Sequence, residues 1–132
     1  RIDDMTRLFR LEEVLDSRAK TLSGGWKRKL SIAMALISEP EVLFLDEPTL
    51  GLDVLARREL WEAVRSLKGK ITIILTTHYM EEAEQLSDRI AIMVGGRIHA
   101  VGTLSELEQL TGEHGLENAF VRIAELAGGD DR

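Results

Sequence analysis

Two short apolar runs constrain the fold of this 132-residue chain more than any other feature. Residues 42–45 read Val-Leu-Phe-Leu and residues 71–75 read Ile-Thr-Ile-Ile-Leu. Runs of this kind are typical of strands that are buried on both faces of a parallel sheet. Helical patterns lie before, between and after them. The sequence therefore predicts an α/β layered fold with a mostly parallel sheet.

Helices are indicated ahead of the first strand. Residues 1–10 and 11–17 show helical spacing, and a third helix restarts after Ser23, which we expect to cap it. Pro40 ends that helix, because proline lacks an amide hydrogen and disfavours helix in the residue before it. The apolar stripe expected on this third helix consists of Leu30, Ala33, Met34 and Ile37.

The alternation continues along the rest of the chain. Asp53 is placed to cap the helix between the two strands, and Gly95-Gly96 is a two-residue hairpin signal. The helix between the strands is expected to bury a core stripe of Leu60, Trp61, Val64 and Leu67. A helix at 81–86 and strands at 90–94 and 97–101 are expected to follow it. The last two expected helices are one that starts with the capping box of Thr103 and Glu106 and one that is lined by Leu116, Ala119, Phe120 and Ile123.

Composition excludes several classes of protein. Seventeen Lys and Arg against 23 Asp and Glu give a net charge of −6, which argues against a broad nucleic-acid-binding face. The absence of cysteine excludes a disulfide framework and a thiol nucleophile. The longest apolar run, residues 32–37, is far shorter than the roughly 18 residues of a membrane span. We expect a soluble, intracellular protein, and the start at Arg1 without an initiator Met predicts a piece of a longer one.

Four segments carry residues suited to chemistry. The first, Leu22-Ser23-Gly24-Gly25-Trp26, directly precedes a helix, where glycines allow close approach and unpaired amides favour an anion. Taken alone, this segment is better explained as a capped turn with flexible glycines.

The second segment places two carboxylates, Asp46 and Glu47, directly after the first buried strand. Consecutive side chains on extended backbone point in opposite directions, so one acid can hold a cation while its neighbour faces a water. Ligands of parallel sheets bind at the carboxyl ends of the strands. The alternative is a solvated turn before Pro48.

The third and fourth segments are weaker. Residues 49–53 form a short loop with Gly51 and the capping Asp53, and residues 76–78 read Thr-Thr-His after the second strand. His78 is positioned to donate to a phosphate oxygen, although a lone histidine is more often a satisfied structural residue.

In this order and at these spacings, the four segments resemble the carboxy-terminal half of an ATP-binding-cassette (ABC) ATPase. Residues 22–26 resemble the family's Leu-Ser-Gly-Gly-Gln signature loop, and residues 42–47 resemble its Walker B strand and catalytic glutamate. Residues 50–53 resemble the D-loop, and His78 resembles the switch histidine. Several motifs in fixed order are far more specific than any one of them. The segment Tyr79-Met80-Glu81-Glu82-Ala83-Glu84 and the chain's ending are most similar to exporter ATPases of the ABC-2 type that serve a separate membrane subunit.

The resemblance implies roles for these residues. Asp46 would hold Mg²⁺, Glu47 would act as general base toward the attacking water, and His78 would contact the γ-phosphate of ATP. The signature residues would bind the γ-phosphate held by the opposite subunit of a head-to-tail dimer, and Asp53 would lie at that interface. The implied partners are a second nucleotide-binding subunit and a membrane-spanning permease, with no nucleic acid, and the implied location is the cytoplasmic, inner face of the cell membrane. The signature residues are Leu22, Ser23, Gly24, Gly25 and Trp26.

The resemblance also implies a partial P-loop NTPase (RecA-like) fold that lacks the P-loop strand, which would lie between the strand before His78 and the strand at 90–94. The expected domains are 1–40, the end of a helical subdomain with the signature loop; 41–94, the catalytic core; and 95–132, the carboxy-terminal hairpin and helices. Two alternatives remain: a related ABC ATPase that acts on DNA or ribosomes, and a non-catalytic dimerisation module. A neighbouring gene for a protein with about six membrane spans would favour transport.

Two departures from the family pattern leave alternatives open. Trp26 replaces the usual glutamine, and its indole would either stack on a partner or pack against its own helix. Lys27, Arg28 and Lys29 either add positive field to the signature loop or form a solvated helix face, which is the favoured interpretation.

We predict that the isolated 132-residue chain binds ATP weakly or not at all and is inactive alone. No Gly-x-x-x-x-Gly-Lys-Ser/Thr segment occurs in the sequence, so the loop that cradles phosphates is absent from it. Isothermal titration with MgATP measures this affinity. A micromolar dissociation constant would contradict the prediction.

Overall fold

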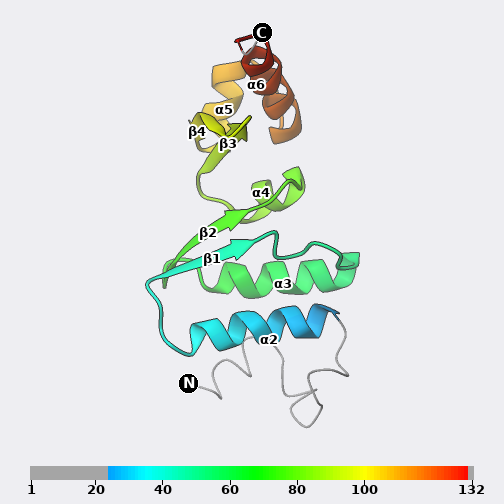
Figure 1. Cartoon of the computed structure of the whole chain (residues 1–132), viewed down its shortest axis with the longest axis vertical. Helices are drawn as coiled ribbons and strands as arrows, with labels where there is room; N and C mark the ends of the chain where they lie inside the picture. The colour runs from blue at the N-terminus through cyan, green and yellow to red at the C-terminus, as the bar shows by residue number, and fades with distance from the viewer. Residues whose placement is uncertain (1–23, 131–132) are drawn as a thin grey trace. The chain divides into compact units, whose positions relative to one another are not determined.

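Two parallel strands form the centre of the first part of the structure. The computed structural model describes residues 24–130. Strand β1 (Val42–Asp46) pairs with β2 (Thr72–Thr76) in parallel, and the register sets Asp46 opposite Thr76. Figure 1 shows the two strands running side by side, with α3 (Val54–Ser66) as the crossover between them. The carboxyl ends of β1 and β2 are therefore adjacent.

The expectation that β1 is buried on both faces is wrong. Leu43 and Leu45 are buried, whereas Val42 is exposed and Phe44 is 71% exposed. Alternate residues of a strand face opposite sides, and the described residues cover only one of these sides. Ile74, which pairs with Phe44, is also exposed, so the uncovered face is continuous across both strands.

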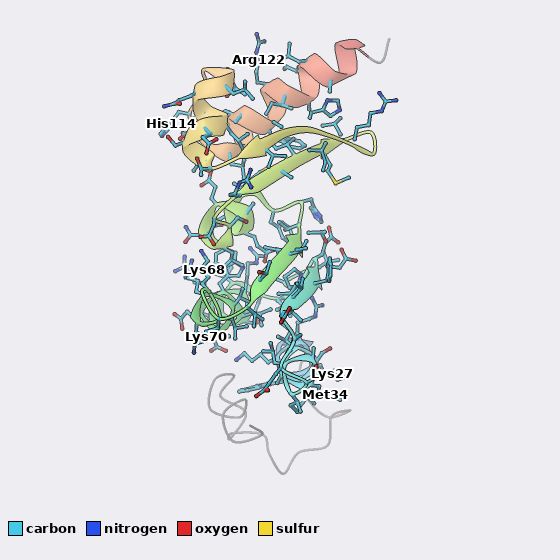
Figure 2. All side chains as sticks on the ribbon, turned by 90° about the vertical axis from the view of Figure 1, so that its left-hand side faces the viewer. Lys27, Met34, Lys68, Lys70, His114 and Arg122 are labelled. Carbon is cyan, nitrogen blue, oxygen red and sulfur yellow. The ribbon has the colours of Figure 1, made fainter. Side chains whose placement is uncertain are left out.

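Helix α2 (Gly24–Leu36) buries a different stripe from the predicted one. Its buried residues are Lys29, Ile32, Ala33 and Leu36. Met34 is 63% exposed, and both Met34 and Lys27 project from α2 in Figure 2. The helix packs against α3, and Lys29 on the buried face forms an ion pair with Glu59 of α3. The predicted helices at 1–10 and 11–17 and the Ser23 cap lie outside the described residues.

Helix α3 begins and packs as the sequence predicts. The Asp53 side chain accepts a hydrogen bond from the Ala56 amide at 2.8 Å and so caps the first turn. Residues at helical spacing form its buried stripe. The buried residues of the helix are Leu60, Trp61, Ala63 and Val64, and its C-cap residue Leu67 is buried as well.

The second part of the chain forms its own compact unit from Tyr79 onward. A two-residue Gly95-Gly96 turn, with φ of 59° and 77°, joins β3 (Ile90–Val94) to β4 (Arg97–Gly102) in an antiparallel pair. Positive φ at both positions matches the twist of a hairpin, so this prediction is confirmed. The described strands therefore form two pairs, one parallel and one antiparallel, rather than one mostly parallel sheet.

Three helices complete this unit, and one apolar cluster holds it together. They are α4 (Met80–Leu86), α5 (Leu104–Thr111) and α6 (Leu116–Asp130). Thr103 and Glu106 form the predicted capping box of α5. The buried cluster consists of Ala83, Ile90, Ile92, Leu107, Leu116 and Ile123. Between residues 24 and 130, no helix is both long and apolar enough to cross a bilayer.

We predict that Leu107→Ala lowers the free energy of unfolding by about 2–5 kcal/mol, because it leaves a cavity in this cluster. Leu110→Ala is the matched control on the same helix, since Leu107 is 1% exposed and Leu110 is 69% exposed. The control should change stability by less than about 0.5 kcal/mol. Urea denaturation followed by circular dichroism measures both values. Equal effects of the two substitutions would show that the cluster does not stabilise this unit.

Candidate active site at the carboxyl ends of β1 and β2

Asp46, the first acidic residue of the site, still belongs to strand β1. Asp46 is the last residue of β1 and lies opposite Thr76, the last residue of β2. The Thr76 hydroxyl donates a hydrogen bond to Asp46 Oδ1 at 2.5 Å. Asp46 remains exposed, so its carboxylate keeps acceptor capacity for a ligand in front of the strand ends.

The second acidic side chain leaves the sheet. Glu47 has φ of 45°, in the left-handed region that non-glycine residues rarely adopt. Its amide still donates to the Thr76 carbonyl at 2.8 Å, which extends the ladder by one bond. The two acids are thus separated by a change of backbone direction, and not by the strand alternation that the sequence predicts. This difference arises because Glu47 already belongs to the turn that follows β1.

The Glu47 carboxylate meets the predicted histidine. Glu47 Oε1 contacts Nδ1 of His78, which follows β2 by two residues. The imidazole is largely exposed and the carboxylate is about one-third exposed, so water has access to the pair. A carboxylate next to an imidazole can accept a proton from such a water. The structure therefore brings together Asp46, Glu47 and His78 from two strand ends.

Two of the three basic residues on α2 do not form a solvated face, so the favoured interpretation is wrong for them. Arg28 donates to the carbonyls of Glu47 and Leu50, each at 3.1 Å, and to the Pro48 carbonyl. Lys29 is 4% exposed and pairs with Glu59 at 2.7 Å. Charged side chains are seldom buried in proteins unless they are paired. The sequence does not reveal that the partners of Arg28 and Lys29 lie about 20 to 30 residues away.

The position of Trp26 favours one of the two alternatives for its indole. Lys29 Nζ lies 4.2 Å from the centroid of the Trp26 ring, three residues along the same helix. A cation over a tryptophan face is attracted by the ring quadrupole. The indole therefore packs against its own helix in this structure.

The remaining predicted site residues lie near the starts of two helices. Gly24 and Gly25 are the first residues of α2, where amides have no partner within the helix. Leu22 and Ser23 fall outside the described residues. Asp53 caps α3, which accounts for one of its carboxylate oxygens. The roles of these residues toward a nucleotide stay predictions.

Thr76 and Arg28 contact the site, although the sequence indicates no role there for either of them. Thr76 could have been identified once the parallel register is known, because it is the hydroxyl residue that ends the strand paired with the strand of Asp46. No local signal identifies Arg28, because its acceptors are backbone carbonyls about twenty residues away.

We predict that Asp53→Ala lowers the free energy of unfolding by about 1 kcal/mol through loss of the α3 cap. Asp53→Asn is the matched control, because asparagine caps helices about as well as aspartate. Thermal or urea unfolding measures the difference. Equal losses in both variants would show that the charge, and not the capping bond, matters for stability.

Comparison with known proteins identifies relatives along nearly the whole chain. The ABC transporter family profile matches residues 1–50. The chain is 50% identical, over 113 residues, to the daunorubicin resistance ATP-binding protein DrrA3 of Streptomyces coeruleorubidus, covering 85% of this chain and 36% of that protein. It is 48% identical to the Nod factor export ATP-binding protein I of Rhizobium etli, covering 98% of this chain and 39% of that protein. The chain thus spans well under half the length of these relatives.

A solved structure has the same fold. The ATP-binding subunit of an ABC transporter matches with a TM-score of 0.77 and 36% identity, over 93% of this chain and 52% of the other. This match confirms the predicted fold class, a partial P-loop NTPase α/β fold. Along nearly its whole length, the chain is therefore similar to the ATP-binding proteins of ABC transporters.

Proposed function

We propose that this chain is part of the ATP-hydrolysing subunit of an ABC transporter that powers export through a separate membrane-spanning partner. The observation that carries this proposal is the meeting of two carboxylates and a histidine at adjacent strand ends: Asp46 beside Thr76, and Glu47 against His78. The name of one relative, the Nod factor export ATP-binding protein I, supports the exporter type.

In the proposed reaction, a water attacks the γ-phosphorus of ATP, and the bond from that phosphorus to the bridging oxygen of ADP breaks. Glu47 accepts the proton of the water as general base. His78 contacts the γ-phosphate and holds Glu47 in place through their contact. Phosphoryl transfer depends on positioning and charge stabilisation more than on covalent chemistry, so this small set of side chains is sufficient for the chain's share of the site.

The donors at the strand ends fit Mg²⁺. This ion prefers oxygen ligands, keeps several waters and takes one or two carboxylates together with substrate phosphates. The Asp46 carboxylate and the Thr76 hydroxyl supply oxygen at an exposed edge. In the part of the chain that the structure describes, no cluster of three or more acidic, His or Cys side chains could hold a metal alone. Mg²⁺ would neutralise phosphate charge when bound, with Asp46 as the residue that holds it.

The other expected residues belong to a second, composite contact. The amides at the start of α2 would bind the γ-phosphate of a nucleotide held by the opposite subunit, because helix starts favour anions. This contact would involve Leu22, Ser23, Gly24, Gly25 and Trp26, with Asp53 at the same dimer interface. ATP would then hold two nucleotide-binding subunits together, and its hydrolysis would release them, on the cytoplasmic face of the membrane.

We predict that Glu47→Gln in the full-length protein lowers kcat for ATP hydrolysis by about 10²- to 10⁴-fold, because the amide cannot accept the proton of the water. Glu62→Gln, at an exposed position of α3, is the matched control and should hydrolyse ATP at the wild-type rate. Phosphate release under saturating MgATP measures kcat. Wild-type turnover by Glu47→Gln would refute the proposed role and favour a non-catalytic module.

A further inference from the structure

One arginine ties α2 to the turn that carries Glu47. Arg28 Nη1 donates to the Glu47 carbonyl at 3.1 Å and to the Pro48 carbonyl, and Nη2 donates to the Leu50 carbonyl at 3.1 Å. A guanidinium group presents its donors in a fixed planar fork, so one side chain reaches three acceptors of the same turn. The backbone from Glu47 to Leu50 is thereby held from a helix that precedes it in the sequence.

The turn requires such support because of its backbone conformation. The φ of 45° at Glu47 is unfavourable for a residue with a Cβ atom, and such residues persist only where several interactions fix them together. The Glu47 amide is fixed by the Thr76 carbonyl at 2.8 Å. Its carbonyl is fixed by the Leu50 amide at 3.2 Å and by Arg28.

The carbonyls of Glu47 and Pro48 accept from Arg28 in the partly buried interior of the turn, whereas the Leu50 carbonyl accepts at its exposed edge. Pro48 and Thr49 are both buried, and proline contributes no amide hydrogen. Buried carbonyl groups in native proteins are nearly always hydrogen-bonded. Arg28 supplies the side-chain donors for the Glu47, Pro48 and Leu50 carbonyls.

We propose that Arg28 is a positioning residue for hydrolysis: by holding the Glu47–Leu50 turn, it keeps the Glu47 carboxylate in the orientation in which it meets His78 and the attacking water. This inference rests on the proposed function. Arg28 itself contacts neither His78 nor Asp46 through any bond that the structure describes. Because α2 begins at Gly24-Gly25, the same side chain joins the predicted γ-phosphate-binding loop to the general base.

The first test compares Arg28→Gln and Arg28→Lys with the matched control Arg58→Gln in the full-length protein. Arg58 is exposed on α3, so the control makes the same chemical change away from the turn. We expect Arg28→Gln to lower kcat about 10- to 100-fold with little change in KM for ATP, because misplacement of a catalytic group affects the chemical step. Arg28→Lys should recover little, since one ammonium group cannot bind three carbonyls in fork geometry. The control should retain wild-type kcat.

A double-substitution cycle then tests whether Arg28 acts through Glu47. Single-turnover rates are measured for Glu47→Gln alone and together with Arg28→Gln. If Arg28 only positions the Glu47 carboxylate, the double variant should be within about twofold of Glu47→Gln. If the rate losses of the two single variants multiply in the double variant, the inference is overturned. A wild-type kcat in Arg28→Gln would also overturn it.

Thermal unfolding separates positioning from a purely structural role. We expect Arg28→Lys to fold, with an unfolding temperature near that of the wild type, while kcat remains reduced. Unfolding of both Arg28 variants would overturn the inference in favour of a structural residue. If Glu47→Gln itself turns over at the wild-type rate, the proposed function fails and the inference fails with it. If Glu47→Gln lowers kcat but the Arg28 variants keep the wild-type kcat, the inference about Arg28 is refuted while the proposed function stands.

Discussion

The parallel pairing of β1 with β2 is the constraint on which the rest of the candidate site depends. It brings Asp46 and Thr76, which are 30 residues apart in sequence, within hydrogen-bonding distance. It also sets the start of the Glu47 turn beside the residues that lead to His78. A shift of register by one residue would turn every side chain of a strand to the opposite face and separate these groups. The backbone hydrogen bonds between the two strands therefore set the positions of the side chains that form the site.

A single change of backbone direction then distinguishes two adjacent carboxylates. Asp46 keeps the strand conformation and shares a hydrogen bond with the neighbouring strand, whereas Glu47 turns away at positive φ and contacts the histidine. The same residue type at either position would face different partners. Environment, and not intrinsic chemistry, thus separates the proposed cation-holding role of Asp46 from the proposed general-base role of Glu47.

Local signals predicted much of the fold, and the failures have a common cause. The hairpin at Gly95-Gly96, the capping box of Thr103 and Glu106 and the Asp53 cap each depend on residues within a few positions, and all are present. The buried stripe of α2 and the covering of β1 depend on what packs against them. The spacing of apolar residues predicts that a helix has a buried stripe. It does not show which of two overlapping stripes is buried, because that depends on distant partners such as Glu59.

By itself, the sequence determined the order of the strands and helices between residues 24 and 130, the resemblance to ABC ATPases and the identity of the acidic and histidine residues at the strand ends. It did so because apolar runs, caps and ordered motifs are local patterns. Only the tertiary structure decided that Arg28 binds the turn after β1, that Lys29 is buried against Glu59, and that Glu47 leaves the strand. These features depend on groups about 20 to 30 residues apart in the sequence, whose approach is set by packing and strand register rather than by any neighbouring residue.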